Sequence, residues 1–114
     1  MRNVFYCLLT MLLLASCQNQ KSLYSWSKYE TTSYDFLKNK DEKSTQKLIE
    51  SYQAIIEKQE GSRKVVPPGI YADYGFILIQ SGKAEQGKAM LQKEVAIYPE
   101  SKVFVERILK MLDK

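Results

Sequence analysis

Histidine is absent from all 114 residues of this chain. Its absence excludes the commonest general base, metal ligand and proton shuttle of proteins, together with every catalytic triad or dyad that needs an imidazole. The chain also lacks a glycine-rich loop followed by a lysine and a hydroxyl residue, so it offers no phosphate cradle. The carboxylate pairs Asp41 with Glu42 and Glu30 with Asp35 suit solvated or capping roles better than acid–base catalysis. We predict no enzymatic activity, no catalytic residue and no metal site.

A strong charge of one sign is lacking as well. The 17 basic and 13 acidic residues are scattered along the chain, and no stretch alternates basic with aromatic residues as a nucleic-acid-binding surface would. We therefore predict no nucleic-acid partner. The modest positive balance is interpreted as a solvated surface with weak attraction to anionic lipid headgroups.

The N-terminal residues form the most informative pattern that is present. Arg2 supplies a positive charge, residues 4–14 are a short apolar run, and the small residues Ala15 and Ser16 stand directly before Cys17. This order is typical of a bacterial lipoprotein signal peptide, so we predict cleavage after residue 16 and lipid on Cys17. The expected lipid is a thioether-linked diacylglycerol with a further N-acyl chain, and we expect no other cofactor.

Two other interpretations of the N-terminus are open. An ordinary secretory signal would also be cut after a small residue, but it needs no cysteine behind the cut. An uncleaved membrane helix would need roughly 20 apolar residues, whereas this run has 11. The other cysteine, Cys7, lies inside the apolar run behind Phe5 and Tyr6, which is a poor context for cleavage.

Removal of residues 1–16 from the 114 would leave 98, enough for one compact domain but few for two. We expect residues 17–22 to be the lipidated cysteine with a short polar tether, and residues 23–114 to be a single domain without a disulfide. Residues 18–22 span on the order of 17 Å when extended, at about 3.4 Å per residue, so the domain would stay close to the membrane. Gln18, rather than aspartate, follows the cysteine. By the enterobacterial sorting rule this favours the outer membrane, where we expect the domain on the periplasmic face.

Hydrophobic periodicity predicts an all-α domain of about five helices. The first is expected after Leu23, because aromatic and aliphatic side chains recur on one helical face from Trp26 to Leu37. Either Asp41 or Ser44 is expected to cap the second helix. The apolar stripe of that helix is formed by Leu48, Ile49, Tyr52, Ile55 and Ile56.

The second half of the chain predicts three further helices. A stiff segment around Pro67 and Pro68 predicts the longest loop, and the helix after it, residues 70–80, is apolar on all sides except at Asp73, so we expect it to be central. A fourth helix is expected over residues 84–97, ending before Pro99. The fifth helix, over residues 100–112, is expected to close the stack with an apolar face made of Val103, Phe104, Ile108, Met111 and Leu112.

Residues 71–99 resemble a tetratricopeptide unit, a repeat of two helices that approach each other through small residues and end at a proline. The matching positions are Gly75, Leu78, Gly82, Gly87, Leu91 and Pro99. Glu94 departs from this pattern, because the repeat family places alanine there. A charge at that contact indicates either a degenerate unit or a carboxylate that is hydrogen-bonded where the helices cross. A poorer copy of the repeat would include Trp26, Tyr29, Leu48, Tyr52 and Ile55.

Three blocks of sequence, residues 23–30, 66–75 and 98–101, resemble those of a family of small Gram-negative lipoproteins classed as a domain of unknown function (number 4810). Members of that family tend to be encoded beside an outer-membrane lipoprotein similar to the curli secretion channel, together with a second small lipoprotein. The resemblance implies a location and a partner, and no activity. An outer-membrane lipoprotein similar to that channel is therefore the partner we expect.

Aromatic residues are abundant in the expected domain, and tyrosine suits both helix junctions and interfaces. Most of the rings fall on packing stripes and are expected in the core. Our candidates for partner binding are Trp26, Tyr29, Tyr71 and Tyr74, which would line a groove for a peptide or helix.

The function we expect is a helical-repeat adaptor, or accessory factor, anchored in the outer membrane and serving an envelope or curli-like secretion complex. One alternative is a structural or surface-exposed lipoprotein that binds peptidoglycan, a glycan or a host component. Another is a small-molecule carrier that uses the apolar helix over residues 70–80.

Overall fold

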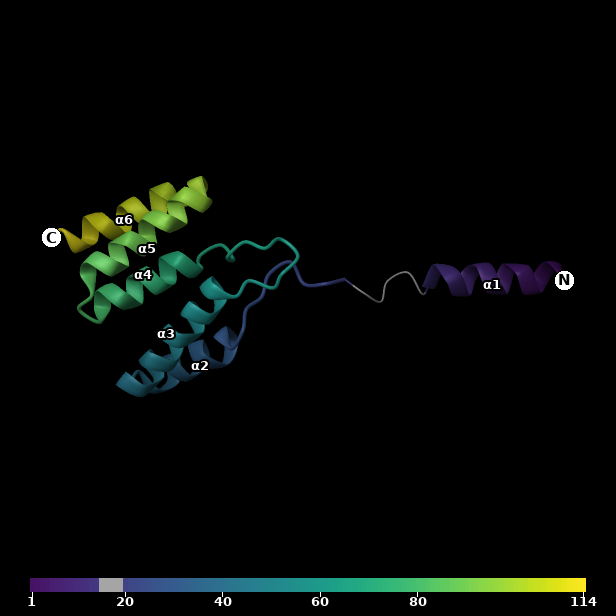
Figure 1. Ribbon diagram of the computed structural model, residues 1–114, viewed down its shortest axis with the longest axis horizontal. Helices are drawn as coiled ribbons and strands as arrows, with labels where there is room; N and C mark the ends of the chain where they lie inside the picture. Colours follow the sequence, from purple (N-terminus) through teal and green to yellow (C-terminus); the bar gives the residue numbers. More distant parts are fainter. Residues whose placement is uncertain (15–19) are drawn as a thin grey trace.

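A computed structural model describes residues 1–14 and 20–114 of the chain. The described residues form six α-helices and one short 3-10 helix, and they contain no strand, which confirms the prediction of an all-α fold. Figure 1 shows five of the α-helices arranged as a stack, with α1 separate from them. The elements are α1 (Arg2–Leu14), α2 (Tyr29–Asn39), α3 (Glu42–Glu57), α4 (Ile70–Gln80), α5 (Ala84–Ile97), η2 (Pro99–Ser101) and α6 (Lys102–Leu112). The expected lipidation site, Cys17, lies outside the described residues.

The first helix, α1, contains the apolar run of the predicted signal peptide. None of its 13 residues is buried. No helix in the described part of the chain combines the length and the apolar character that crossing a membrane requires.

Helices α2 and α3 form an antiparallel hairpin with a tight turn. Lys40 adopts the left-handed conformation that ends α2, with φ of 49°. The carboxylate of Asp41 then accepts a hydrogen bond of 2.7 Å from the backbone N–H of Ser44, and the Ser44 hydroxyl accepts one from the backbone N–H of Asp41. This reciprocal arrangement is a capping box, so both residues that the sequence offered as alternative caps act together.

Helices α4 and α5 form the second hairpin, and they approach closely where two glycines face each other. A Cβ atom on Gly75 would lie 2.6 Å from the carbonyl oxygen of Gly87, so any larger residue would force the two backbones apart. Gly82 connects the helices in the left-handed conformation, with φ of 82°, which glycine adopts without strain. The bounds of both helices agree with the predicted ranges.

Helix α4 is central, as predicted, because it contributes to two hydrophobic clusters. One cluster joins α4 to α3 and includes Leu48, Ile55 and Ile77. The other joins α4 to α5 and α6 and contains Ala72, Leu91, Val105 and Ile108. Both clusters have nearly inaccessible members, with Ile55 and Leu91 each at 0% exposure.

The last helix differs from the prediction in its start and in its packing face. The chain first makes the 3-10 turn η2, and α6 begins only at residue 102. Val105 and Ile108 are buried against α5, whereas Val103, Phe104 and Met111, which the sequence placed on the packing face, are exposed. The helix carries apolar residues on more than one side, and their spacing alone does not show which side meets α5.

The segment before α2 is not helical, although the sequence predicted helix there. Ser62 and Arg63 donate backbone hydrogen bonds of 3.0 and 3.1 Å to the carbonyl oxygens of Ser22 and Leu23. The Gln59 side chain accepts a hydrogen bond from the backbone N–H of Ser25 and donates one to its carbonyl. These bonds use backbone groups that a helix would need, so α2 begins at residue 29 and Trp26 lies outside it. We call residues 22–25 together with 59–63 the N-terminal clasp.

Candidate functional site

A row of aromatic rings extends from the N-terminal clasp into the core. Its members are Tyr24, Trp26, Tyr29, Tyr52 and Tyr74, in that order, and consecutive ring centroids are 6.3, 5.9, 5.6 and 5.6 Å apart. These separations are typical of favourable aromatic pairs, each worth about 0.5–1.5 kcal/mol beyond the burial of its area. The row therefore attaches the clasp and α2 to α3 and α4.

The four aromatic residues predicted to bind a partner divide into two pairs. Tyr71 and Tyr74 are each 8% exposed, and both belong to the core. The ammonium of Lys93 lies 5.8 Å from the ring centroid of Tyr71, and Gln53 donates a hydrogen bond to the hydroxyl of Tyr74. Trp26, in contrast, is 44% exposed, and Tyr29 is half-buried. Only these two rings have substantial area available for a partner.

Tyr29 lies in a groove between α2 and α4 whose floor is formed by α3. The hollow has a volume of about 580 Å³ and combines apolar residues with a carboxylate and a lysine. Phe76 and Leu37 are 38% and 66% exposed, although both are large hydrophobic residues. We call this feature the α2–α4 groove. It is lined by Tyr29, Ser33, Phe36, Leu37, Lys40, Leu48, Tyr52, Asp73, Phe76, Ile77 and Gln80.

A carboxylate in this groove interacts with the aromatic row. The Tyr29 hydroxyl donates a hydrogen bond of 3.3 Å to Asp73. Burial is the main cause that raises the pKa of Asp73, and the negative charge of Glu94 raises it further, whereas the hydrogen bond from Tyr29 lowers it. The burial of Asp73 is partial, because its side chain is still open to solvent. Burial and the Asp73 charge likewise raise the pKa of Tyr29, and the pKa of Tyr52 is raised for the same reasons. At neutral pH both tyrosines are therefore protonated, and Tyr29 is available as a donor.

Three groove residues, Asp73, Phe76 and Leu37, were not among the binding residues predicted from the sequence. One signal could have identified Asp73, because it is the only charged residue in an otherwise apolar helix. Leu37 was expected on the packing face of its helix, but it is 66% exposed. The α2–α4 groove contains a hydrogen-bonded tyrosine–carboxylate pair, Tyr29 and Asp73. It offers apolar area, one carboxylate and one lysine, which is the chemistry of a binding surface.

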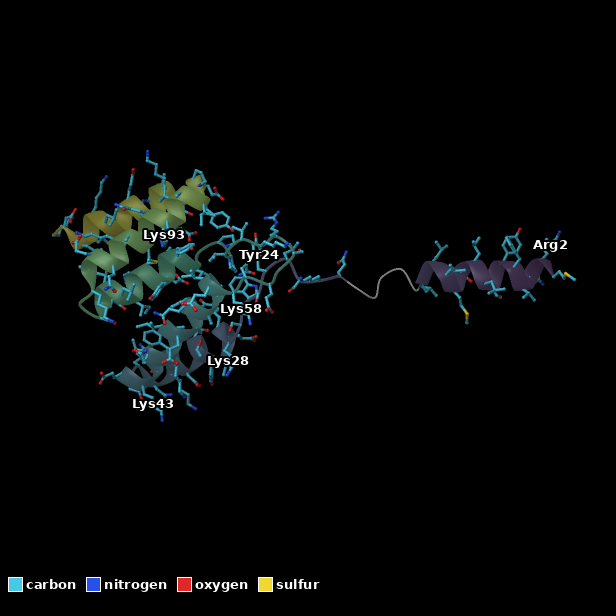
Figure 2. The ribbon with its side chains drawn as sticks, in the orientation of Figure 1. Arg2, Tyr24, Lys28, Lys43, Lys58 and Lys93 are labelled. Carbon is cyan, nitrogen blue, oxygen red and sulfur yellow. The ribbon has the colours of Figure 1, made fainter. Side chains whose placement is uncertain are left out.

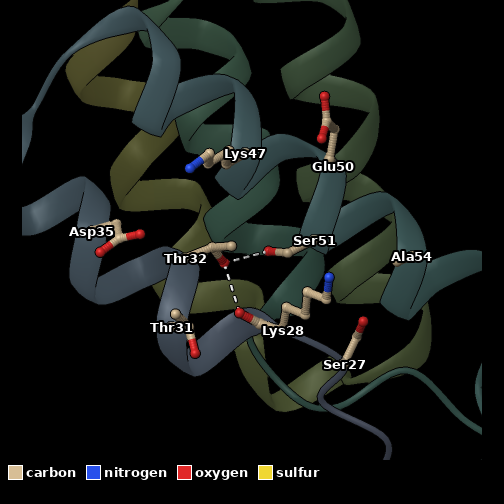
Figure 3. Close-up of a pocket in the computed structure, with 9 residues that line it drawn as sticks. All are labelled: Ser27, Lys28, Thr31, Thr32, Asp35, Lys47, Glu50, Ser51 and Ala54. Carbon is tan, nitrogen blue, oxygen red and sulfur yellow. Dashed lines mark hydrogen bonds between the residues drawn. The ribbon is translucent and has the colours of Figure 1, made fainter.

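The other side of α2 faces a second, polar hollow of about 730 Å³ between α2 and α3 (Figure 3). Thr32 donates a hydrogen bond of 2.9 Å to the buried hydroxyl of Ser51, which fixes the crossing of the two helices. Two lysines and two carboxylates line the hollow, so its charges balance and favour neither an anion nor a cation. The four are Lys28, Asp35, Lys47 and Glu50.

Glu94, the residue that departs from the repeat pattern, is a buried carboxylate at 1% exposure. Its Oε1 atom accepts a hydrogen bond of 2.7 Å from the backbone N–H of Gly69, at the N-terminus of α4. No side chain at the N-cap position of α4 caps that helix. Glu94 thus caps α4 from the neighbouring helix. Of the two alternatives left open by the sequence, the hydrogen-bonded carboxylate is the one observed, although its bond lies at the N-terminus of α4 and not where α4 and α5 cross.

Among the described residues no group of three or more cysteine, histidine, aspartate or glutamate side chains is arranged to hold a metal ion. The described free cysteine, Cys7, is exposed on α1.

A comparison with protein families gives one match. The model described as Domain of unknown function (DUF4810) matches residues 23–108, which include the N-terminal clasp except Ser22, both hairpins and most of α6. No curated protein and no solved structure matches the chain.

Proposed function

We propose that this chain, which belongs to the family described as Domain of unknown function (DUF4810), is a lipid-anchored helical adaptor. The lipoprotein signal pattern at residues 2–17 supports the anchor. The protein is held at the periplasmic face of the outer membrane through Cys17. There it assists an envelope or curli-like secretion complex, and its partner is an outer-membrane lipoprotein similar to the curli channel. The observation that carries the adaptor role is the α2–α4 groove with its exposed apolar rim.

The features of α1 support the anchor. Its 13 residues bury nothing, and the hydrogen-bonded body of the domain begins at Ser22, where the N-terminal clasp starts. A segment without packing contacts can be removed without loss of core, as expected for a cleaved signal peptide. Once it is removed, two or three acyl chains on one cysteine give a stable anchor, because a single chain binds only marginally.

The second hairpin supports the likeness to a tetratricopeptide repeat. The small residues of the pattern, Gly75 and Gly87, are the two that face each other where α4 and α5 cross. The large residues of the pattern, Leu78 and Leu91, are both buried. Stacked helical hairpins of this kind commonly present a groove to a peptide or helix of a partner.

The groove has the composition of a surface that binds a partner segment. Leu37 and Phe76 expose large apolar area on its two walls, and Asp73 and Lys40 add one charge of each sign. A partner segment with an apolar ridge and a basic residue next to Asp73 would complement it, since the Asp73 carboxylate accepts hydrogen bonds from cations.

Capture of the partner tests this proposal. The lipidated protein is isolated from its native host in mild detergent, and the co-purified envelope proteins are identified. The variant Leu37→Ser/Phe76→Ser removes apolar area from the groove, whereas Val103→Ser/Phe104→Ser removes a similar exposed area from α6. We expect the groove variant to lose the partner by about tenfold or more, as truncation of central interface residues typically does. Equal recovery with both variants, or no envelope protein with the wild type, would contradict the adaptor role.

A further inference from the structure

Positive charge is concentrated in two segments of the chain that are hydrogen-bonded to each other. Residues 20–28 and 58–69, which meet in the N-terminal clasp, contain five basic residues and one acidic residue. The remainder of residues 17–114 contains 11 basic and 12 acidic residues. We call the surface formed by residues 20–28 and 58–69 the clasp surface. It carries the whole positive excess of the domain.

The charges of the clasp surface are available to a ligand. Its basic residues, Lys21, Lys28, Lys58, Arg63 and Lys64, are all exposed. Lys28 also lines the polar hollow between α2 and α3, where Asp35 and Glu50 lie, so the other four are the charges available here. The acidic residue, Glu60, lies 3.9 Å from Lys58, and both side chains are more than two-thirds exposed, so this pair neutralises little. Figure 2 shows Tyr24 and Lys58 at the end of the body that the N-terminal segment approaches, with Lys43 at the opposite end.

Apolar side chains project from the same surface. Leu23, Trp26 and Val65 are 57%, 44% and 37% exposed. The Arg63 guanidinium donates a hydrogen bond of 2.9 Å to the Tyr24 hydroxyl and lies 5.7 Å from the centroid of its ring. Basic residues interleaved with tryptophan and aliphatic side chains match the interface of a phospholipid bilayer, where aromatic rings settle at headgroup level and cations meet phosphate.

The clasp also limits how far this surface can move from the anchor. The carbonyl of Ser22 accepts a hydrogen bond from the backbone N–H of Ser62, so the hydrogen-bonded body of the domain begins there. If Cys17 carries lipid, as the proposed function holds, residues 18–22 extend at most about 17 Å, at about 3.4 Å per residue. The turns at residues 40–41 and 81–83 lie at the opposite end of the helices (Figure 1).

We infer that the clasp surface is a binding face for anionic phospholipid headgroups, which sets the orientation of the domain on the membrane. Lys21, Lys58 and Lys64 contact phosphate, and Leu23 and Trp26 reach the interfacial layer. The helices then stand away from the bilayer, and their far turns are the parts most distant from it. This inference rests on the proposed anchor but not on the adaptor role of the groove.

Trp26 makes the inference directly measurable, because it is the only tryptophan of the chain. The mature lipidated protein is reconstituted into vesicles of phosphatidylcholine alone and of an equimolar mixture with phosphatidylglycerol. Acrylamide quenching of tryptophan emission is then measured in each. We expect quenching to fall by about twofold or more in the anionic vesicles, with a blue shift of the emission, and high salt to reverse both changes because it screens the lysines.

Two matched variants locate the effect. Lys58→Glu/Lys64→Glu reverses two charges on the clasp surface, and Lys43→Glu/Lys83→Glu makes the same change at the opposite end. The first variant should be quenched equally in both kinds of vesicle, and the second should behave as the wild type. Circular dichroism checks that both variants are folded. The inference would be overturned if wild-type Trp26 were quenched equally in both kinds of vesicle, or if both variants lost the difference between the vesicles to the same extent. Equal quenching of the wild type is the result expected if the true ligand of this surface is an acidic protein.

Flotation separates this test from the proposed function. Protein without lipid on Cys17 would not float with phosphatidylcholine vesicles, and the anchor would then be wrong. If the clasp surface binds lipid, the protein without lipid on Cys17 would still float with the anionic vesicles, and this flotation would depend on Lys58 and Lys64. If the clasp surface does not bind lipid, that protein would not float with either kind of vesicle. Loss of the adaptor role would appear only in the capture experiment and would leave the quenching results unchanged.

Discussion

Replacement of Glu94 by alanine tests how the two halves of the second hairpin are joined. The repeat pattern places alanine at this position, so sequence resemblance alone would expect the substitution to be harmless. In the structure Glu94 is 1% exposed and accepts a 2.7 Å hydrogen bond from the N–H of Gly69. We therefore expect Glu94→Ala to destabilise the domain.

The magnitude follows from two destabilising contributions and one that opposes them. Loss of a hydrogen bond to a carboxylate costs about 1.5–3 kcal/mol, and the half-buried Gly69 N–H is left without its acceptor. Truncation of a buried side chain adds a small cavity. Relief of burying a carboxylate acts in the other direction, since the second oxygen, Oε2, has no hydrogen-bond partner among the described residues. The net expected loss is about 2 kcal/mol.

Urea unfolding measures this loss. With a slope of about 1–3 kcal/mol per molar urea for a small domain, the midpoint should fall by about 1 M with an unchanged slope. The exposed Gln92 on the same helix provides the control, because Gln92→Ala should change stability by less than about 0.5 kcal/mol. Amide hydrogen exchange at Gly69 should become faster in Glu94→Ala alone. A Glu94→Ala protein as stable as the wild type, with Gly69 equally protected, would refute the capping role.

Three further predictions concern the same helical body. Gly75→Ala should lose about 2 kcal/mol or more in urea unfolding despite the better helix propensity of alanine, because the new Cβ would lie 2.6 Å from the Gly87 carbonyl oxygen; a more stable variant would contradict the close approach. Thr32→Val should lose about 1 kcal/mol through its bond to Ser51, and Thr31→Val, at an exposed neighbour, almost nothing, so equal losses would argue against that bond. Tyr98 donates a 2.7 Å hydrogen bond to the Val66 carbonyl, and burial raises its pKa to about 12. A tyrosine whose pKa is raised on folding stabilises the folded state fully below its unfolded pKa of about 10, and this contribution is lost as the pH rises to about 12. The difference in free energy of unfolding between wild type and Tyr98→Phe should therefore shrink over this pH range. A constant difference would contradict the prediction.

Local sequence signals predicted most of the helical architecture. The helices over residues 70–80 and 84–97 were predicted with their observed bounds, because Gly82 and Pro99 mark where each of them ends. The central position of α4 followed from its apolar character on all sides. The capping chemistry of α3 was also visible, although the sequence left open whether Asp41 or Ser44 would serve.

Contacts between distant segments were not predictable from the sequence alone. The start of α2 is set by hydrogen bonds between residues 22–25 and residues 59–63, and nothing in the local pattern of either segment reveals that they meet. The same is true of α6, where only the position of α5 shows that Val105 is buried and Phe104 is exposed. Of the candidate binding residues, Tyr71 and Tyr74 lie in the core, because periodicity places rings on a helical face without indicating which helix covers them.

The anchored location is the central claim of this account, and the mass of the mature protein tests it most directly. Intact-protein mass spectrometry is performed on material from the native host. We predict a chain that begins at Cys17 and carries the additional mass of a diacylglycerol and an N-linked acyl chain. A chain that retains residues 1–16, or one that begins at Cys17 with an unmodified thiol, would contradict the account.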